Sequence, residues 1–172
     1  PDYYEKVKRY ADIISAPAKY LDPLVTEKTF KVIADSGNET VFQYIDTNSS
    51  RANIEVINSK LTGQKVAIIG LGGTGAYILD MIAKTPVKEI HLFDGDSFDQ
   101  HNAFRSPGAA PLAVLENGLA KADYFAGIYQ QMHKNIIPHT YYVKGSNLEE
   151  LDTMTFVFIC VDNNAARKAI ID

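Results

Sequence analysis

The chain has 172 residues, 46% of them hydrophobic and 22% charged, which is enough for one sizeable core with a small appendage. Its net charge of −4 argues against a nucleic-acid-binding surface, which needs a concentrated basic face. The single cysteine, Cys160, excludes a disulfide framework and fits a cytoplasmic protein, and no apolar run approaches the length of a membrane span.

The two ends of the sequence indicate a piece of a longer protein. The chain begins at Pro1 without an initiator methionine, and residues 1–30 do not resemble a signal peptide. It stops at Asp172, inside a helical pattern. We therefore expect the main domain to be truncated at its C-terminus.

Residues 1–46 are predicted to be a separate N-terminal segment, small and mainly helical, that is the remnant or linker of another domain. Apolar residues at helical intervals predict a helix over residues 4–14, and Pro17 is expected to interrupt the chain beyond it. A second helix over 24–34 and a short strand over 40–45 complete the segment.

Residues 47–172 are predicted to form the second domain, which opens with a helix start at 47–50 and a helix over 52–61. Elements then alternate, with strands expected at 65–70, 87–93, 140–143 and 155–160, a loop at 94–111, and helices at 73–83, at about 112–132 and from Asn164 onward. Because the strands are apolar almost throughout, they predict a mostly parallel sheet flanked by helices, an α/β Rossmann-like fold. The carboxyl ends of such strands share one edge.

A glycine-rich turn follows the first predicted strand. The residues Gly70-Leu71-Gly72-Gly73-Thr74-Gly75 come directly after the apolar run Val66-Ala67-Ile68-Ile69. Glycines let the backbone turn tightly and approach a ligand, and the next helix offers free N–H groups and a positive dipole end to phosphate. Asp94 ends the second strand, where an acidic residue is placed to bind ribose hydroxyls. The sequence therefore predicts a nucleotide site.

The residues of the loop after the second strand distinguish between two kinds of nucleotide site. A nicotinamide site needs one ribose-binding acid here, whereas this loop adds Asp96, Asn102 and Arg105. Arginine neutralises phosphate oxygens with two parallel hydrogen bonds, and asparagine donates or accepts without adding charge. The combination indicates a triphosphate and a metal ion.

These motifs resemble the ThiF/MoeB/ubiquitin-activating enzyme family, whose pattern is GxGGxG, then DxD, then N-x-x-R. The matching residues are Gly70 to Gly75, Asp94-Gly95-Asp96 and Asn102-Ala103-Phe104-Arg105, with Lys121 and then Cys160-Val161-Asp162-Asn163 and Arg167 further along the chain. The resemblance covers roughly residues 50–172. It implies a ThiF-like adenylyltransferase that uses ATP to activate the C-terminal carboxylate of a ubiquitin-like or sulfur-carrier protein, giving an acyl adenylate and pyrophosphate.

The resemblance also implies roles for single residues. The implied nucleotide contacts are Gly70, Gly72, Gly73, Gly75, Asp94, Asp96, Asn102, Arg105 and Lys121, with Asp94 on the ribose. The implied catalytic set is Arg105, Lys121, Asp162 and Arg51. Asp162 is the implied Mg²⁺ ligand, a carboxylate of the kind that hard cation prefers. Arg51 is the candidate for an arginine that reaches the ATP of the partner subunit, because family members form dimers and a homodimer is expected.

Two departures from the family pattern concern the loop and the N-terminus. The family usually has Gln after its Arg, whereas here Ser106-Pro107-Gly108 comes next, and the stretch from Arg105 to Lys121 is a few residues longer than usual. The segment before residue 45 does not match the family's short N-terminus. This suggests a bacterial ThiF-type protein with an extra N-terminal domain.

Two other functions remain open, and Cys160 has its own interpretation. An NAD-dependent oxidoreductase would account for the glycines and Asp94 but leaves Asn102, Arg105 and Asp162 unexplained. A catalytically inactive scaffold with this fold could serve dimerisation. Cys160 ends an apolar run that reads as a buried strand, so it is predicted to be structural. A thioester cysteine or zinc-binding cysteines would then lie beyond Asp172, and the histidines here show no metal-ligand spacing.

Overall fold

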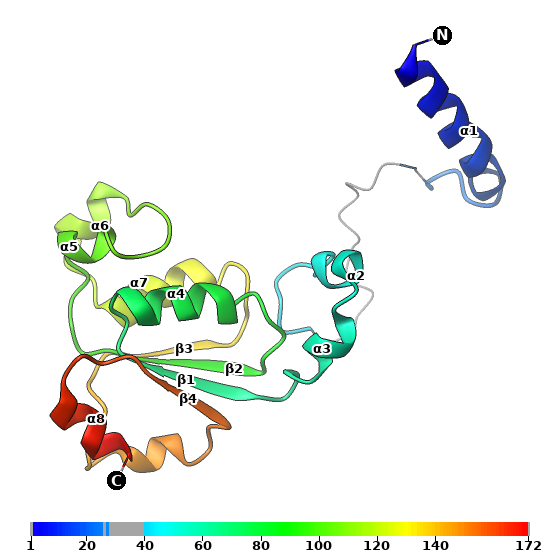
Figure 1. The fold of residues 1–172 in the computed structure, drawn as a ribbon. Coiled ribbons are helices and arrows are strands. Elements are labelled where there is room, and N and C mark those ends of the chain that lie inside the picture. The colour runs from blue at the N-terminus through cyan, green and yellow to red at the C-terminus, as the bar shows by residue number, and fades with distance from the viewer. Residues whose placement is uncertain (1, 26, 28–39, 172) are drawn as a thin grey trace. The chain divides into compact units, whose positions relative to one another are not determined.

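The computed structural model describes residues 2–25, 27 and 40–171 (Figure 1). The chain divides into two compact units between residues 36 and 37. The described part of the first unit is a helix and the turn after it, and the second unit contains the sheet. No helix in the described ranges is both long and apolar enough to cross a bilayer.

The helix described in the first unit is α1, which spans Tyr3–Leu21. The Asp2 carboxylate caps its first turn. The helix expected at 4–14 is present, but the prediction that Pro17 interrupts it is wrong. Proline removes one backbone donor, and the hydrogen bonds on either side carry the helix through it. The helix expected at 24–34 lies for the most part outside the described residues.

Four parallel strands form one sheet in the second unit. They are β1 (Lys65–Ile69), β2 (Glu89–Phe93), β3 (Ile136–His139) and β4 (Phe156–Ile159), in the spatial order β3-β2-β1-β4. In the register, Ile68 lies beside Leu92 of β2 and Phe158 of β4. The parallel, Rossmann-like α/β fold predicted from the sequence is confirmed. The carboxyl ends of all four strands therefore lie at one edge.

Helices cover both faces of this sheet (Figure 1). Helices α4 (Gly73–Ile82) and α7 (Lys121–Tyr129) lie on one face, and the short 3₁₀ helix η1 (Leu148–Leu151) and α8 (Asn164–Ile171) lie on the other. Side chains of β1 alternate between the two layers: Ile68 packs with Leu79 and Phe125, and Ile69 packs with Leu151. Each fully buried aliphatic side chain contributes about 1.5–3 kcal/mol to folding.

The long helix predicted at 112–132 is two helices. Helix α6 (Leu112–Asn117) ends at Gly118, whose φ of 60° lies in the left-handed region that glycine adopts without a Cβ penalty. A backbone bridge between Ser97 and Ala120 then fixes the start of α7. The interruption places Lys121 at the first residue of a new helix rather than in the middle of a long one.

The strand predicted at 140–143 is wrong, because the third strand is β3, at 136–139. Pro138 hides it in the sequence, since proline cannot donate to a strand ladder and usually argues against a strand. Here β3 is the edge strand next to β2, where one side of the ladder needs no partner. Residues 140–143 instead form the loop that leaves the carboxyl edge of the sheet.

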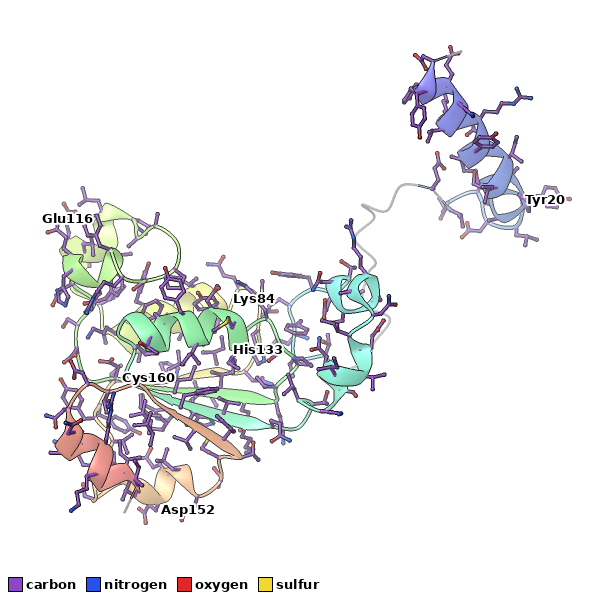
Figure 2. The ribbon with its side chains drawn as sticks, in the orientation of Figure 1. Tyr20, Lys84, Glu116, His133, Asp152 and Cys160 are labelled. Carbon is purple, nitrogen blue, oxygen red and sulfur yellow. The ribbon has the colours of Figure 1, made fainter. Side chains whose placement is uncertain are left out.

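The segment before β1 is less regular than predicted. Its helices are α2 (Asn48–Ala52) and α3 (Glu55–Ser59). They replace the helix expected at 52–61 because Asn53 takes a left-handed conformation with φ 55°. The strand expected at 40–45 is only an isolated antiparallel bridge between Phe42 and His133. His133 marks the amino edge of the sheet, opposite to Cys160 at the carboxyl edge (Figure 2).

The turn between β1 and α4 requires glycine at two positions for different reasons. Gly70 has a φ of 90°, and its backbone lies against Val161 and Cys160. A Cβ on Gly75 would lie 1.9 Å from the carbonyl oxygen of Gly70. A Cβ on Gly72, in contrast, would have no atom of the described residues within 4 Å.

Replacing Gly75 with alanine is expected to lower the free energy of unfolding by about 3 kcal/mol, because a backbone oxygen must move to admit the methyl group. Gly72→Ala is the matched control and should cost less than about 1 kcal/mol, mainly as a poorer helix N-cap. Urea unfolding monitored by circular dichroism measures both. Equal stability of the two variants would contradict this account of the turn.

Candidate active site

A cavity of about 690 Å³ lies at the carboxyl edge of the sheet. It is lined by the glycine turn, the residues after β2 and β4, the start of α7 and the loop after β3. The predicted site residues that line it are Gly70, Gly72, Gly73, Asp94, Asp96, Arg105, Lys121 and Asp162. Gly75, Asn102 and Arg51 do not line it. The structure thus brings most of the predicted residues together around one space.

The start of α4 faces this cavity. Gly72 is its N-cap and makes no side-chain capping bond, and the first N–H groups of any helix lack intrahelical partners. Gly72 and Gly73 both line the cavity. Because packing does not require a bare Cα at Gly72, its glycine leaves room for a group that enters the cavity. Free N–H groups and the helix dipole favour an anion there.

Asp94 is buried and connects β2 to the glycine turn. One of its carboxylate oxygens, Oδ2, accepts a hydrogen bond from the Leu71 N–H at 2.7 Å. The other, Oδ1, accepts from the Asp96 N–H at 2.9 Å. The sequence pattern assigns Asp94 to a ligand and gives no sign of this structural role. Each carboxylate oxygen has a second lone pair, so the two roles are compatible.

Lys121 is a buried lysine whose ammonium lies between two carboxylates. Its Nζ is 2.7 Å from Asp96 Oδ2 and 3.8 Å from Asp94 Oδ1. Only 7% of the residue is exposed. Its backbone N–H donates to the Asp96 carbonyl at 2.9 Å, which holds the start of α7 against the loop. A buried lysine remains charged at low cost only when it is paired in this way.

Asp96 is half exposed and is bound from two sides. Besides Lys121, the hydroxyl of Tyr142 donates a hydrogen bond to its Oδ1. The hydrogen bond from Lys121 and, after it, the one from Tyr142 lower the pKa of this carboxyl. Tyr142 is absent from the predicted site because the sequence pattern places it inside a strand. Pro138 was the available signal, because proline is tolerated on an edge strand. A strand placed around Pro138 would have put Tyr142 in the loop that follows.

Asn102 and Arg105 lie in and after the short helix α5 (Gln100–Ala103) and have different environments. Asn102 is buried, and its Oδ1 accepts from the Asp99 N–H at 3.0 Å, which caps α5. Arg105 is exposed, and its guanidinium makes no hydrogen bond or ion pair to any described residue. The structure therefore places an unpaired cation, but not the asparagine, at the cavity.

Asp162 comes after β4 and is exposed at the cavity, and its carboxylate has no partner among residues 40–171. Its neighbours hold the backbone in place without it. The Asn163 side chain accepts from the Ala165 N–H at 2.8 Å and caps α8, and Arg167 Nε donates to the Val161 carbonyl at 2.7 Å. Asp162 is thus a free acidic group on a fixed loop.

Cys160 lies just after β4 (Figure 2), and it lines the same cavity. It follows the last residue of the strand and is half-buried. Its side chain packs against the apolar layer under α4. Burial raises the pKa of its thiol. Since the thiolate is the reactive form, this environment disfavours nucleophilic chemistry at Cys160.

Arg51 lies apart from the other predicted residues. It is exposed on α2, and α2 and α3 lead into the amino end of β1 (Figure 1). The cavity lies at the opposite, carboxyl edge of the sheet. Within one chain, Arg51 therefore does not contribute to the site.

Comparison with known proteins divides the chain at residue 47. Residues 47–172 match the ThiF family, and residues 1–47 match a domain of unknown function, DUF6791. Ubiquitin-like modifier-activating enzyme 5 of Drosophila mojavensis is 27% identical over 131 residues, 70% of this chain and 33% of that protein. The enzyme of the same name from Aedes aegypti is 26% identical over 122 residues, 64% of this chain and 31% of that protein. The chain thus spans about a third of the curated relatives it matches.

Solved structures share the fold at low sequence identity. E. coli tRNA N6-threonylcarbamoyladenosine dehydratase, TcdA, in complex with ATP matches with a TM-score of 0.60 and 19% identity, covering 72% of this chain and 51% of that one. E. coli MccB matches with a TM-score of 0.58 and 18% identity, over 69% and 36% of the two chains. PaaA matches with a TM-score of 0.59 and 17% identity, over 99% and 59%.

The paired state of Asp96 predicts a pH-dependent contribution to stability. Its pKa in the folded protein lies below the ordinary value of 3.8, so the pairing stabilises the protein above that pH and is lost as the pH falls. Asp96→Asn should therefore be less stable than wild type at pH 7, by about 1 kcal/mol because the group is half exposed, and the difference should shrink towards pH 3.

Thermal unfolding between pH 7 and pH 3 measures this difference. Glu116→Gln is the matched control, because Glu116 is exposed on α6 and forms no ion pair with a described residue. A gap between wild type and Asp96→Asn that stays constant over this range would contradict the assigned pairing.

Proposed function

The chain belongs to the ThiF family, and from this we propose that its cavity binds ATP for the adenylation of a protein carboxylate. The substrate class we propose is the C-terminus of a ubiquitin-like or sulfur-carrier protein, and the products are an acyl adenylate and pyrophosphate. One observation carries the proposal: a single cavity is lined by a glycine turn, a buried lysine, and two side chains of opposite charge, Arg105 and Asp162, that have no partner among the described residues.

Nucleotide binding is supported by the layout of the cavity. The free N–H groups at the start of α4, beside Gly72 and Gly73, would receive phosphate oxygens. Asp94, at the end of β2, would accept the ribose hydroxyls through its remaining lone pairs. TcdA, which shares this fold, has been solved in complex with ATP and in complex with AMP. This supports a nucleotide as the ligand.

The proposed reaction needs no nucleophile from the protein. A carboxylate oxygen of the substrate attacks the α-phosphorus of ATP, and a new P–O bond forms there. The bond from the α-phosphorus to the oxygen that bridges to the β-phosphorus breaks, and pyrophosphate leaves with its electron pair. Lys121 and Arg105 would neutralise the charge that accumulates on the phosphate oxygens, so positioning and electrostatics supply the rate.

The described residues fit a magnesium ion held partly by the nucleotide. Asp162 offers one unpaired carboxylate at the cavity, and Mg²⁺ in phosphate-transfer sites commonly takes one or two protein carboxylates, with phosphates and waters completing its shell. When bound, the ion would supply further charge neutralisation at the phosphates. Asp162 would hold it on the side of the cavity formed by the loop after β4.

The proposed substrate class and domain layout rest on the relatives. The curated relatives are named ubiquitin-like modifier-activating enzymes, which supports a ubiquitin-like carboxylate over a small acid. We propose residues 1–46 as part of another domain, which is supported by their separate family match and by the division of the chain near residue 36. A homodimer is proposed for the ThiF-like part.

Nucleotide binding tests the proposal first. Calorimetric titration of the full-length protein should show binding of ATP with Mg²⁺ and none of NADH. Asp162→Ala should lose the magnesium-dependent part of the affinity, while Asp152→Ala, an exposed acid away from the cavity, should not. Binding of NADH without ATP would contradict adenylation and favour an oxidoreductase, and silence with both would favour an inactive scaffold.

Arg105→Ala should slow adenylate formation by about 10²–10³-fold, since it removes one positioned charge partner of the transition state. ATP-dependent pyrophosphate exchange with the carboxylate substrate measures the rate. Because Arg105 has no partner among the described residues, the melting temperature should stay close to that of wild type. An unchanged rate would exclude the assigned role.

If Arg51 reaches the nucleotide of the partner subunit, two inactive variants should restore each other's activity in a mixed dimer. Arg51→Ala and Asp162→Ala homodimers should each be inactive. Mixed dimers carry one site with an intact cavity and an intact arginine from the other subunit, so an equimolar mixture should recover roughly a quarter of wild-type activity. A mixture as inactive as its components would exclude the contribution of Arg51 across a dimer interface.

A further inference from the structure

Tyr142 connects the loop after β3 to the charge cluster beside the cavity. It lines the cavity, and its hydroxyl donates a hydrogen bond to Asp96 Oδ1. The other oxygen of that carboxylate, Oδ2, accepts from Lys121 Nζ at 2.7 Å. The two oxygens of Asp96 are thus shared between a phenol on one side and an ammonium on the other.

The ring of Tyr142, which is half exposed, packs against the backbone at Gly95. A Cβ built on Gly95 would lie 2.8–2.9 Å from three atoms of the Tyr142 ring, closer than real Cβ contacts allow. Gly95 stands between Asp94 and Asp96 and carries no positive φ, so its lack of a side chain serves the ring rather than a turn. Any side chain at residue 95 would therefore collide with the Tyr142 ring in its present position.

The hydrogen bond from Tyr142 to Asp96 affects Lys121, because Lys121 is buried whereas Asp96 is half exposed. Half of the Asp96 side chain is exposed, so Lys121 alone leaves it free to change rotamer. The hydrogen bond from Tyr142 fixes the second oxygen and, with it, the direction in which Oδ2 faces Lys121. The ammonium is thus paired with a carboxylate that is itself held from both sides.

We infer that Tyr142 is a positioning residue for nucleotide binding, which acts through Asp96 to orient the Lys121 ammonium towards the phosphates. This inference rests on the proposed function, since it requires a phosphorylated ligand in the cavity. It concerns the phosphates alone, because Asp94, the residue proposed for the ribose, is held by its own hydrogen bonds to Leu71 and Asp96 N–H groups.

Tyr142→Phe tests the inference because it removes the hydroxyl and keeps the ring over Gly95. The affinity of the full-length protein for ATP with Mg²⁺ should fall about tenfold, the loss expected for one hydrogen bond to a charged group. The affinity for adenosine, measured by competition, should stay within about twofold. The matched control is Tyr141→Phe, because the Tyr141 hydroxyl donates to Glu150 and its side chain does not line the cavity.

Gly95→Ala provides a second, independent variant. Its methyl group should displace the Tyr142 ring, so ATP affinity should fall by a similar factor, and combining it with Tyr142→Phe should add little. Equal losses for ATP and adenosine would overturn the inference, because Tyr142 would then shape the whole pocket. An ATP affinity of Tyr142→Phe equal to that of wild type would overturn this inference and leave the proposed function intact. Failure of the wild-type protein to bind ATP would overturn both.

Discussion

One buried carboxylate holds the candidate site together. Asp94 ends β2, yet its oxygens bind the backbone of the glycine turn after β1 and of the loop after β2. Strand register alone would bring these segments near each other, but it would leave their loops free to move. The bond from the Leu71 N–H is buried, so breaking it would leave a buried donor without a partner. The placement of the glycine turn therefore depends on the same residue that we propose for the ribose.

Charges around the cavity fall into two groups with different purposes. The ammonium of Lys121 is buried in the wall and is compensated there by Asp96 at 2.7 Å and Asp94 at 3.8 Å. Arg105, Lys144 and Asp162 are exposed at the cavity, and their charged groups have no partner among the described residues. A site for a polyphosphate with its cation needs free charges of both signs, whereas a site for an uncharged substrate would not. The division thus agrees with the ligand proposed from the family.

The sequence allowed the fold and the ends of its inner strands to be predicted, because glycine turns and strand-end acids recur at fixed places in parallel sheets. It did not reveal side-chain contacts between loops. Pro138 concealed an edge strand, and this put Tyr142 in the wrong element. Asn102 matches the family motif, yet in this structure it caps α5. Periodicity continued through Gly118, whose left-handed φ has no signature beyond the glycine itself.

Because α6 ends at Gly118, the length of residues 106–117 does not determine where α7 begins. Helix α7 is held at its first turn by the Ser97–Ala120 bridge and by the bond from the Lys121 N–H to the Asp96 carbonyl. Nothing in that attachment depends on the path taken by residues 106–117. Loop-closure entropy grows only slowly with added residues. Residues added or removed in this stretch would therefore leave the lysine in place, so the loop can change in length without changing the wall of the cavity.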